Sequence, residues 1–182
     1  MKTIIVCAGH SDQQSGAVSP DGKYKEEDLA QRLRNRVATL LRADGQFRVL
    51  TDGGDRENKP LRDAVQLVKA NPGALAIEIH FNAASQPSVK GVEVLSKPQH
   101  KLLAQQLAFS IAEITGSPLR GVLGWRADNA GQHHRLAFCE VGGAIVEVEF
   151  LSNPDALTQY LTLESEVAIS LANALRDAAK GV

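Results

Sequence analysis

Cysteine is scarce in this chain, with two residues in 182 and neither at metal-ligand spacing from the other. Two cysteines are too few for the disulfide framework that holds many small secreted proteins together. Cys7 and Cys139 both lie in apolar surroundings. We therefore expect both to be buried as small hydrophobic side chains, in preference to a disulfide bridge between them.

Long apolar runs and an excess of either charge are also lacking. No run approaches the length of a membrane span, and residues 1–7 are too few for the apolar region of a signal peptide. The 20 Lys and Arg nearly balance the 21 Asp and Glu, so the chain has no basic footprint for nucleic acid or an anionic membrane. We expect synthesis in the cytoplasm, no nucleic-acid partner and no membrane span.

The composition is that of an ordinary globular protein. Hydrophobic residues make up 43% of the chain and charged residues 23%, which is far from the signature of disorder. A length of 182 residues fits one domain better than two. We predict a single domain over residues 1–182, with a monomer as the default state.

Strand-like runs alternate with helical patterns along the chain. Apolar runs bounded by turn residues predict strands at residues 3–7, 47–51, 75–80, 91–95 and 142–150. Apolar residues at helical spacing predict helices at residues 26–43, 61–70, 98–115 and 161–179, while residues 119–135 look irregular. This alternation predicts an α/β fold in which a twisted, mainly parallel sheet is flanked by helices on both faces.

Two histidines stand at the ends of predicted strands. His10 follows the first strand and His80 ends the third, and ligands bind beyond the carboxyl edge of a parallel sheet. Glu26 begins the first helix, where a negative charge is favoured and can face the same crevice. Two imidazoles and one carboxylate make a catalytic zinc site with one position left for water. We therefore predict that His10, Glu26 and His80 bind Zn²⁺.

The last predicted strand carries two acidic residues. Strand alternation places Glu147 and Glu149 on the same face as Ile145. Acidic side chains in a buried strand are costly unless they are paired or linked to a metal. We predict that Glu147 is the general base that takes a proton from zinc-bound water and later delivers it to the leaving group.

Several stretches, taken together, resemble a known family. They are Ile4-Ile5-Val6-Cys7-Ala8-Gly9-His10, Gly16-Ala17, Glu26, Glu78-Ile79-His80-Phe81-Asn82-Ala83, Arg120-Gly121-Val122 and Val146-Glu147-Val148-Glu149-Phe150-Leu151-Ser152-Asn153-Pro154. In this order they resemble the zinc-dependent N-acetylmuramoyl-L-alanine amidases of bacterial wall remodelling and phage endolysins. The resemblance runs over nearly the whole chain. It implies that His10, Glu26 and His80 bind zinc and that Glu147 is the catalytic acid/base.

The resemblance also implies a reaction, namely hydrolysis of the amide between the muramoyl lactyl group and the first L-alanine of the peptidoglycan stem peptide. Because the sequence shows no recognisable signal peptide, linker or separate wall-binding domain, it favours a phage endolysin acting on peptidoglycan of the periplasm or cell wall. A catalytic fragment of a longer exported bacterial amidase is an alternative. Two rival functions are a zinc peptidase cutting within the stem peptide and a non-catalytic peptidoglycan-binding module.

The sequence departs from the family pattern near the predicted site. Cys7-Ala8 stands where the family usually has Asp-Pro, and Thr51-Asp52 where it usually has Thr-Arg, which leaves open what supports His10. Glu149 replaces a usual glycine, and it either shares a proton with Glu147 or orients it.

Other assignments near the site have alternatives. Glu27 is a rival of Glu26 as the metal ligand, although the helical pattern favours Glu26. Glu78 either belongs to the site or forms a buried ion pair with an Arg or Lys. His133 and His134 either line a substrate groove or belong to a solvated loop, and the loop is the more common situation.

Overall fold

The computed structural model describes residues 1–43, 45–129 and 136–181. Six strands form one sheet in the order β2-β1-β3-β6-β4-β5. The neighbours among β2, β1, β3 and β6 are parallel, whereas β4 runs antiparallel to β6, and β5 runs parallel to β4. The sheet is therefore mainly parallel, as predicted. The strand bounds are β1 Thr3–Ala8, β2 Arg48–Thr51, β3 Leu75–Asn82, β4 Glu93–Ser96, β5 Trp125–Ala127 and β6 Ala144–Phe150.

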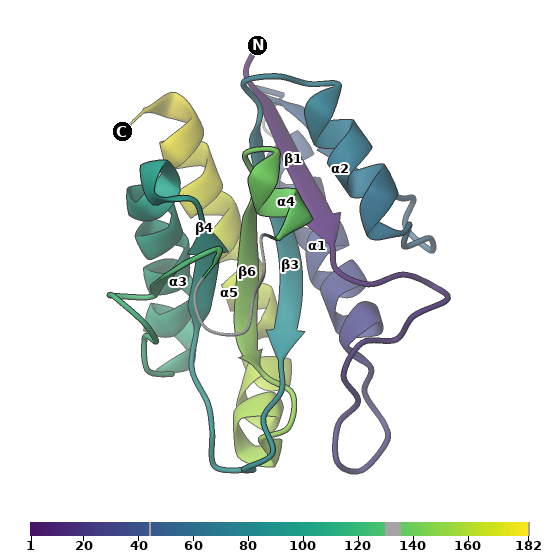
Figure 1. The fold of residues 1–182 in the computed structure, drawn as a ribbon, viewed down its shortest axis with the longest axis vertical. Coiled ribbons are helices and arrows are strands. Elements are labelled where there is room, and N and C mark those ends of the chain that lie inside the picture. The colour runs from purple at the N-terminus through teal and green to yellow at the C-terminus, as the bar shows by residue number, and fades with distance from the viewer. Residues whose placement is uncertain (44, 130–135, 182) are drawn as a thin grey trace.

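Helices cover both faces of the sheet (Figure 1). One face carries α1 (Glu26–Ala43), α3 (Lys101–Thr115) and α5 (Pro154–Lys180), and α5 packs against both α1 and α3. The other face carries α2 (Leu61–Lys69) and the short α4 (Ala137–Glu140), and a 3-10 turn at Pro98–His100 precedes α3. The predicted single α/β domain with helices on both faces is confirmed.

The central strands are buried on both faces, which explains their nearly continuous apolar sequences. In β6, Val146 and Val148 join the larger core under α1, α3 and α5, whereas Ile145 joins the smaller core on the opposite face. In β1, Val6 belongs to the larger core and Cys7 to the smaller one. The two-residue period of each strand thus divides its side chains between two hydrophobic layers.

The C-terminal helix differs from the prediction at its start. The apolar stripe indicated residue 161, but α5 begins at Pro154. The side chain of Asn153 accepts hydrogen bonds from the backbone N–H groups of Asp155 and Ala156, at 3.1 and 3.0 Å. This N-cap, worth about 1 kcal/mol, and a proline at the first helical position start the helix before its buried stripe begins.

Two small elements were not predicted. β5 lies within the stretch expected to be irregular, and α4 follows it. Elements of three and four residues are too short to show a periodic pattern in sequence. Cys7 and Cys139 are buried and free, as expected. Among the described residues, no helix combines the length and apolar character needed to cross a membrane.

Candidate metal centre and active site

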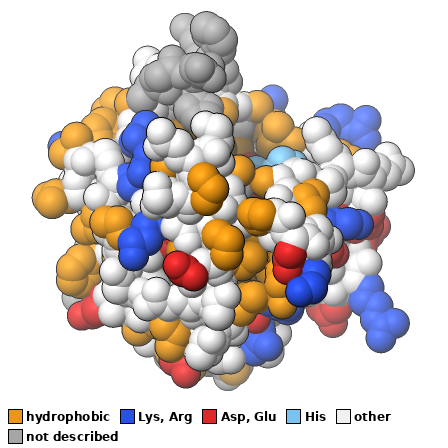
Figure 2. Space-filling view, turned by 90° about the horizontal axis from the view of Figure 1, so that it is seen from below, with side chains coloured by type: hydrophobic (Ala, Val, Ile, Leu, Met, Phe, Trp, Pro, Cys, Tyr) orange, Lys and Arg blue, Asp and Glu red, His pale blue; other side chains and the backbone are white. Residues whose placement is uncertain are grey.

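The side chains singled out in the sequence meet at the carboxyl edge of the parallel strands. His10 follows β1, Glu26 is the first residue of α1, His80 lies near the end of β3, and Glu147 lies in β6. All four line one cleft of about 300 Å³. Figure 2 views this end of the molecule and shows histidine surface recessed between neighbouring side chains. Residues far apart in the chain therefore form one site.

Glu26 lies between the two histidines. Its Oε2 is 2.9 Å from Nε2 of His10, and its Oε1 is 3.0 Å from Nδ1 of His80. One ligand atom from each of the three residues lies within 4.8 Å of the others. Two imidazole nitrogens and a carboxylate this close match the donor set of a catalytic zinc site. Within the described chain, Glu27 is not part of this cluster.

Backbone groups fix the carboxylate of Glu26. Ala17 N–H donates to its Oε2 at 2.9 Å, and Phe81 N–H donates to its Oε1 at 3.1 Å. Burial disfavours the charged form, but hydrogen bonds from His10 and His80 outweigh burial and lower the pKa of Glu26 to about 2. Glu26 is therefore ionised, as a metal ligand must be.

His80 lies between two carboxylates. Its Nδ1 faces Glu26, and its Nε2 is 3.0 Å from Oε2 of Glu78, which is buried. Burial favours the neutral ring, but Glu26 and Glu78 outweigh it and raise the pKa of His80 well above its usual value. Among the described residues, the ion-pair partner of Glu78 is thus a histidine of the site, and no Arg or Lys is paired with it. A carboxylate behind a metal-binding imidazole fixes the orientation of the ring.

Two glycines allow this close packing. A Cβ on Gly9 would lie 2.2 Å from the ring of His80. A Cβ on Gly16 would lie 2.5 Å from Oε2 of Glu26 and 2.6 Å from Nε2 of His10. Gly16 also has a φ of +67°, which favours glycine. The backbone therefore approaches all three candidate ligands at positions where no side chain fits.

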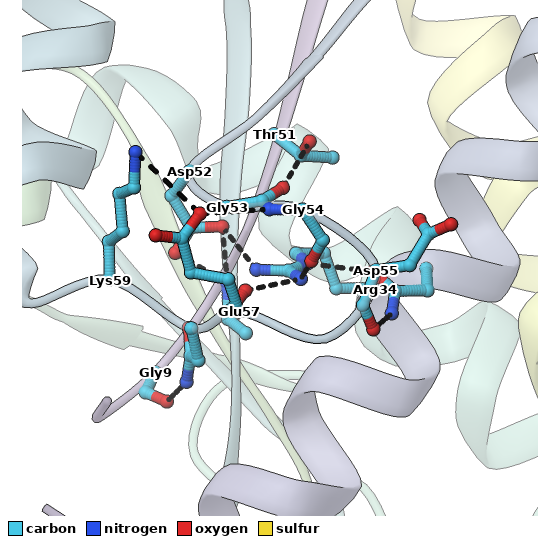
Figure 3. A network of polar contacts seen from close by, with 12 residues as sticks. Gly9, Arg34, Thr51, Asp52, Gly53, Gly54, Asp55, Glu57 and Lys59 are labelled. Atoms are coloured by element: carbon cyan, nitrogen blue, oxygen red, sulfur yellow. Dashed lines mark hydrogen bonds and ion pairs between the residues drawn. The ribbon is translucent and has the colours of Figure 1, made fainter. Parts of the chain in front are cut away.

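A buried polar network supports the strand that leads into His10 (Figure 3). Asp52 accepts from Ala8 N–H at 3.3 Å and forms an ion pair with Arg34 at 2.9 Å, both side chains being fully buried. Asn58 donates from its side chain to the carbonyl of Gly9 at 2.8 Å. The family usually has Asp-Pro and Thr-Arg at the corresponding positions. This chain thus supports the His10 segment with Asp52, which follows β2, and with Arg34 of α1.

Glu147 is paired with His80 in the register of β3 and β6. Burial, together with nearby carboxylates that include Glu26, raises the pKa of Glu147 to about 7 against the opposing effect of His80. Its Oε2 is buried and has no hydrogen-bond partner among the described residues. Among the described residues, Glu147 is thus a half-buried carboxylate that has one oxygen without a hydrogen bond and a pKa near neutrality.

Glu149 is engaged by donors other than Glu147. Its carboxylate accepts from the backbone N–H of Gly91 at 2.7 Å, from Phe150 N–H at 2.9 Å and from the hydroxyl of Ser117. None of the hydrogen bonds recorded for it in the described residues reaches Glu147. Glu149 is therefore a structural residue that satisfies buried donors where β4 begins.

A family model described as N-acetylmuramoyl-L-alanine amidase matches residues 4–178. The chain belongs to the N-acetylmuramoyl-L-alanine amidase family. The match spans β1 to α5 and confirms the expected family and enzyme class. The site described above is therefore found in an amidase fold.

Relatives of the amidase family share both sequence and fold with this chain. A candidate N-acetylmuramoyl-L-alanine amidase from Neisseria meningitidis is 42% identical, with 98% of this chain and 96% of that chain covered and a TM-score of 0.85. N-acetylmuramoyl-L-alanine amidase LytC of Bacillus subtilis is 28% identical over 84% of this chain. The germination-specific amidase of the same organism is 28% identical over 86%. The chain spans 30% of the length of LytC and 70% of the length of the germination-specific amidase.

Some residues near the site were missed by sequence analysis, or lie beyond what the structure describes. The role of Asn58 depends on a contact with Gly9 across the fold, which no local pattern indicates. Glu93 stands between two valines of a strand. Because buried acids need partners, this residue could have been recognised from the sequence as part of a polar cluster. His133 and His134 lie outside the described residues.

Proposed function

We propose that this chain hydrolyses the amide between the N-acetylmuramoyl lactyl group and L-alanine of peptidoglycan, and that it needs zinc to do so. The observation that carries the proposal is the cluster of His10, Glu26 and His80 in one cleft with Glu147. Family membership supports the bond that is cleaved. We further propose that residues 1–182 form one amidase catalytic domain.

The residues present fit a zinc ion. Three nitrogen and oxygen donors leave room for a further ligand in tetrahedral geometry. Nδ1 of His80 is the nitrogen that faces the other two candidate ligands, because Nε2 faces Glu78. When bound, zinc would supply a Lewis acid that polarises the scissile carbonyl and lowers the pKa of water.

Glu147 is the proton carrier in this proposal. Its pKa of about 7 lets it exist in both protonation states near neutral pH, which suits a general base that later becomes a general acid. Its unpartnered Oε2 can accept a proton from the attacking water and return it to the leaving amide nitrogen. Because water attacks the amide directly and Glu147 carries the proton in both transfers, the reaction needs no covalent enzyme intermediate.

Digestion of purified peptidoglycan tests this function. We expect new lactyl carboxylates and free L-alanine amino groups, activity that is lost on chelation and restored by zinc, and a loss of about 10²- to 10⁴-fold for Glu147→Gln. Glu164→Gln is the control, since Glu164 is also buried but pairs with Arg32 away from the cleft. An unimpaired Glu147→Gln enzyme would contradict the assignment.

The products separate the two rival functions. A zinc peptidase would release amino acids or shortened peptides in place of whole stems, which mass spectrometry distinguishes. A non-catalytic binding module would release nothing, and Glu147→Ala would bind the wall as well as wild type does. The presence of a complete candidate ligand set beside Glu147 favours an enzyme over the binding module. Membership of the amidase family favours the amidase over the peptidase.

The endolysin role and the monomeric state stay predictions. If the protein is an endolysin, its cytoplasmic expression should leave cells intact until the inner membrane is permeabilised, and lysis should then follow rapidly. A bacterial remodelling amidase expressed at the same level would cut the wall without this abrupt loss of turbidity. Light scattering of the purified chain checks the monomer.

A further inference from the structure

Two arginines converge on one buried carboxylate next to Glu147. Nε of Arg120 lies 3.2 Å and Nε of Arg126 lies 2.7 Å from Oε2 of Glu93. Glu93 is directly opposite Glu147 in the antiparallel pair of β4 and β6. Opposed residues of such a pair project from the same face of the sheet. Arg126 pairs in register with Leu95, which lines the cleft, so Arg120 and Arg126, which we call the arginine pair, lie beside the cleft.

The arginine pair is held in place by more than its ion pairs. The guanidinium of Arg120 stacks over the ring of Phe150 at 4.7 Å. The stem of Arg120 passes over Gly91, where a Cβ would lie 2.9 Å from its Cγ, and the stem of Arg126 passes over Gly121, where the distance would be 2.8 Å. Both stems thus run over positions without side chains. Arginines fixed in this way lose little conformational entropy on binding a ligand.

The arginine pair still has donors and charge to offer. Its side chains are 30% and 37% exposed, whereas that of Glu93 is 6% exposed. Glu93 is engaged through the Nε atoms, and the only acceptor recorded for a terminal nitrogen in the described residues is the carbonyl of Lys90, 3.5 Å from Arg120 Nη1. Two guanidinium groups share the one carboxylate of Glu93, so their terminal nitrogens can donate to a carboxylate of a ligand.

The order of the strands indicates which part of the substrate would meet the arginine pair. β1 and β3 bring the candidate metal ligands to one side of Glu147, and β4 and β5 lie on its other side. The scissile carbonyl belongs at the metal, and Glu147 protonates the leaving nitrogen. The leaving peptide therefore extends past Glu147 toward β4, where Arg120 and Arg126 lie.

We propose that the arginine pair binds a carboxylate of the stem peptide on the leaving-group side of the scissile amide. The proposal rests on the proposed amidase function, since that function defines the leaving group. The fork of an arginine matches a carboxylate with two parallel hydrogen bonds, and a carboxamide offers neither the charge nor the second acceptor. The arginine pair thus selects stem peptides that carry a free carboxylate close to the scissile amide.

Two synthetic substrates test this selection. N-acetylmuramoyl dipeptides are prepared with the α-carboxyl group of the second residue either free or converted to the carboxamide. Zinc-loaded wild type should prefer the free acid by about tenfold or more in kcat/KM, mainly through KM. Arg126→Gln and Arg120→Gln should each lose most of this preference, measured as the ratio of kcat/KM for the free acid to kcat/KM for the carboxamide, and Arg126→Lys should retain part of it.

Arg32→Gln is a matched control. Nε of Arg32 lies 2.6 Å from the buried carboxylate of Glu164, and its side chain is 43% exposed, but it lies on α1 away from the cleft. This variant should keep the full preference. Calorimetric titration of the metal-free protein with the two released dipeptides makes the same comparison without turnover.

The outcomes separate the two proposals. No wild-type preference in turnover or binding, or an equal loss on both substrates in the arginine variants, overturns the carboxylate site and leaves the amidase function standing. Failure of wild type to cleave either substrate, together with failure to cut peptidoglycan at the lactyl amide, overturns both. Unfolding midpoints of the variants show whether a loss reflects misfolding.

Discussion

Each of the two carboxylate oxygens of Glu26 makes two contacts. Each oxygen receives one backbone N–H, from Ala17 or Phe81, and each faces one imidazole, of His10 or His80. These four contacts hold the carboxylate in one orientation. The candidate ligands are therefore arranged before an ion arrives, which reduces the free energy spent on ordering them when it binds.

Glu78 should contribute to zinc affinity through His80. Glu78→Ala removes the carboxylate 3.0 Å from His80 Nε2 and frees the ring to rotate, so we expect zinc to bind about 10- to 100-fold more weakly. Glu78→Gln keeps an acceptor and should lose less. Competition with a chromophoric chelator measures the affinity. If Glu78→Ala binds zinc as tightly as the control Glu164→Ala, the positioning role is excluded.

Gly16 should be irreplaceable for metal binding. Gly16→Ala places a methyl group 2.5 Å from Glu26 Oε2 and should weaken zinc binding more than about tenfold, because the candidate ligands must separate. Gly22→Ala is a matched control, since Gly22 also has a positive φ but has no atom within 4 Å of an added Cβ. It should cost about 1 kcal/mol of stability and leave zinc affinity unchanged.

Sequence reasoning reached some of these residues and not others. His10 and Glu26 are recognisable because they stand after a strand at the carboxyl edge of the sheet and at a helix N-terminus, where ligands and acids are favoured. Glu147 is recognisable because an acid is unusual inside a buried strand. The partner of Glu78 and the structural role of Glu149 were not predictable. Both depend on contacts between side chains and segments brought together only by the fold.

At the scale of elements, the ion pair of Arg34 and Asp52 links α1 to the loop after β2, and Asp52 reaches β1 through Ala8 N–H. Arg34 also donates to the carbonyls of Gly54 and Glu57 (Figure 3). Arg34 of α1 thus contacts the loop after β2 and, through Asp52, is linked to β1. This set of contacts, which we call the junction, positions the His10 segment.

Breaking the junction should destabilise the domain. Asp52→Ala leaves Arg34 charged and buried without its carboxylate, and we expect a loss of about 3–5 kcal/mol in the free energy of unfolding. Urea denaturation measures it. The double variant Arg34→Met with Asp52→Leu should lose less than Asp52→Ala alone. A small loss for the single variant would show that water reaches the pair.

The predicted boundaries of helices matched the structure where capping residues and apolar periodicity indicated the same position. The helix predicted over residues 26–43 is α1 as found, because its acidic first turn and buried stripe begin together. For α5 the cap at Asn153 precedes the stripe, so periodicity placed the start too late. Capping chemistry was the better guide to where that helix begins.

At the scale of the molecule, the candidate ligands come from β1, α1 and β3, which pack against one another only in the folded chain. An unfolded chain cannot hold three such groups together, so zinc should bind the native state alone. At a free zinc concentration of 100 times Kd, this linkage stabilises the fold by about 2.7 kcal/mol.

Thermal unfolding with and without a chelator checks this linkage. We expect zinc to raise the unfolding midpoint in proportion to the logarithm of its concentration, and Mg²⁺ to have no such effect. His80→Ala should abolish the zinc-dependent shift while the protein stays folded. An identical shift in that variant would place the ion elsewhere.

The two edge strands of the sheet are short, β2 with four residues and β5 with three. Unpaired N–H and C=O groups along a sheet margin are templates on which another chain can add a strand. Short edge strands offer few such groups, so self-association by strand addition is disfavoured. A protein of this shape should therefore resist fibril growth even when concentrated.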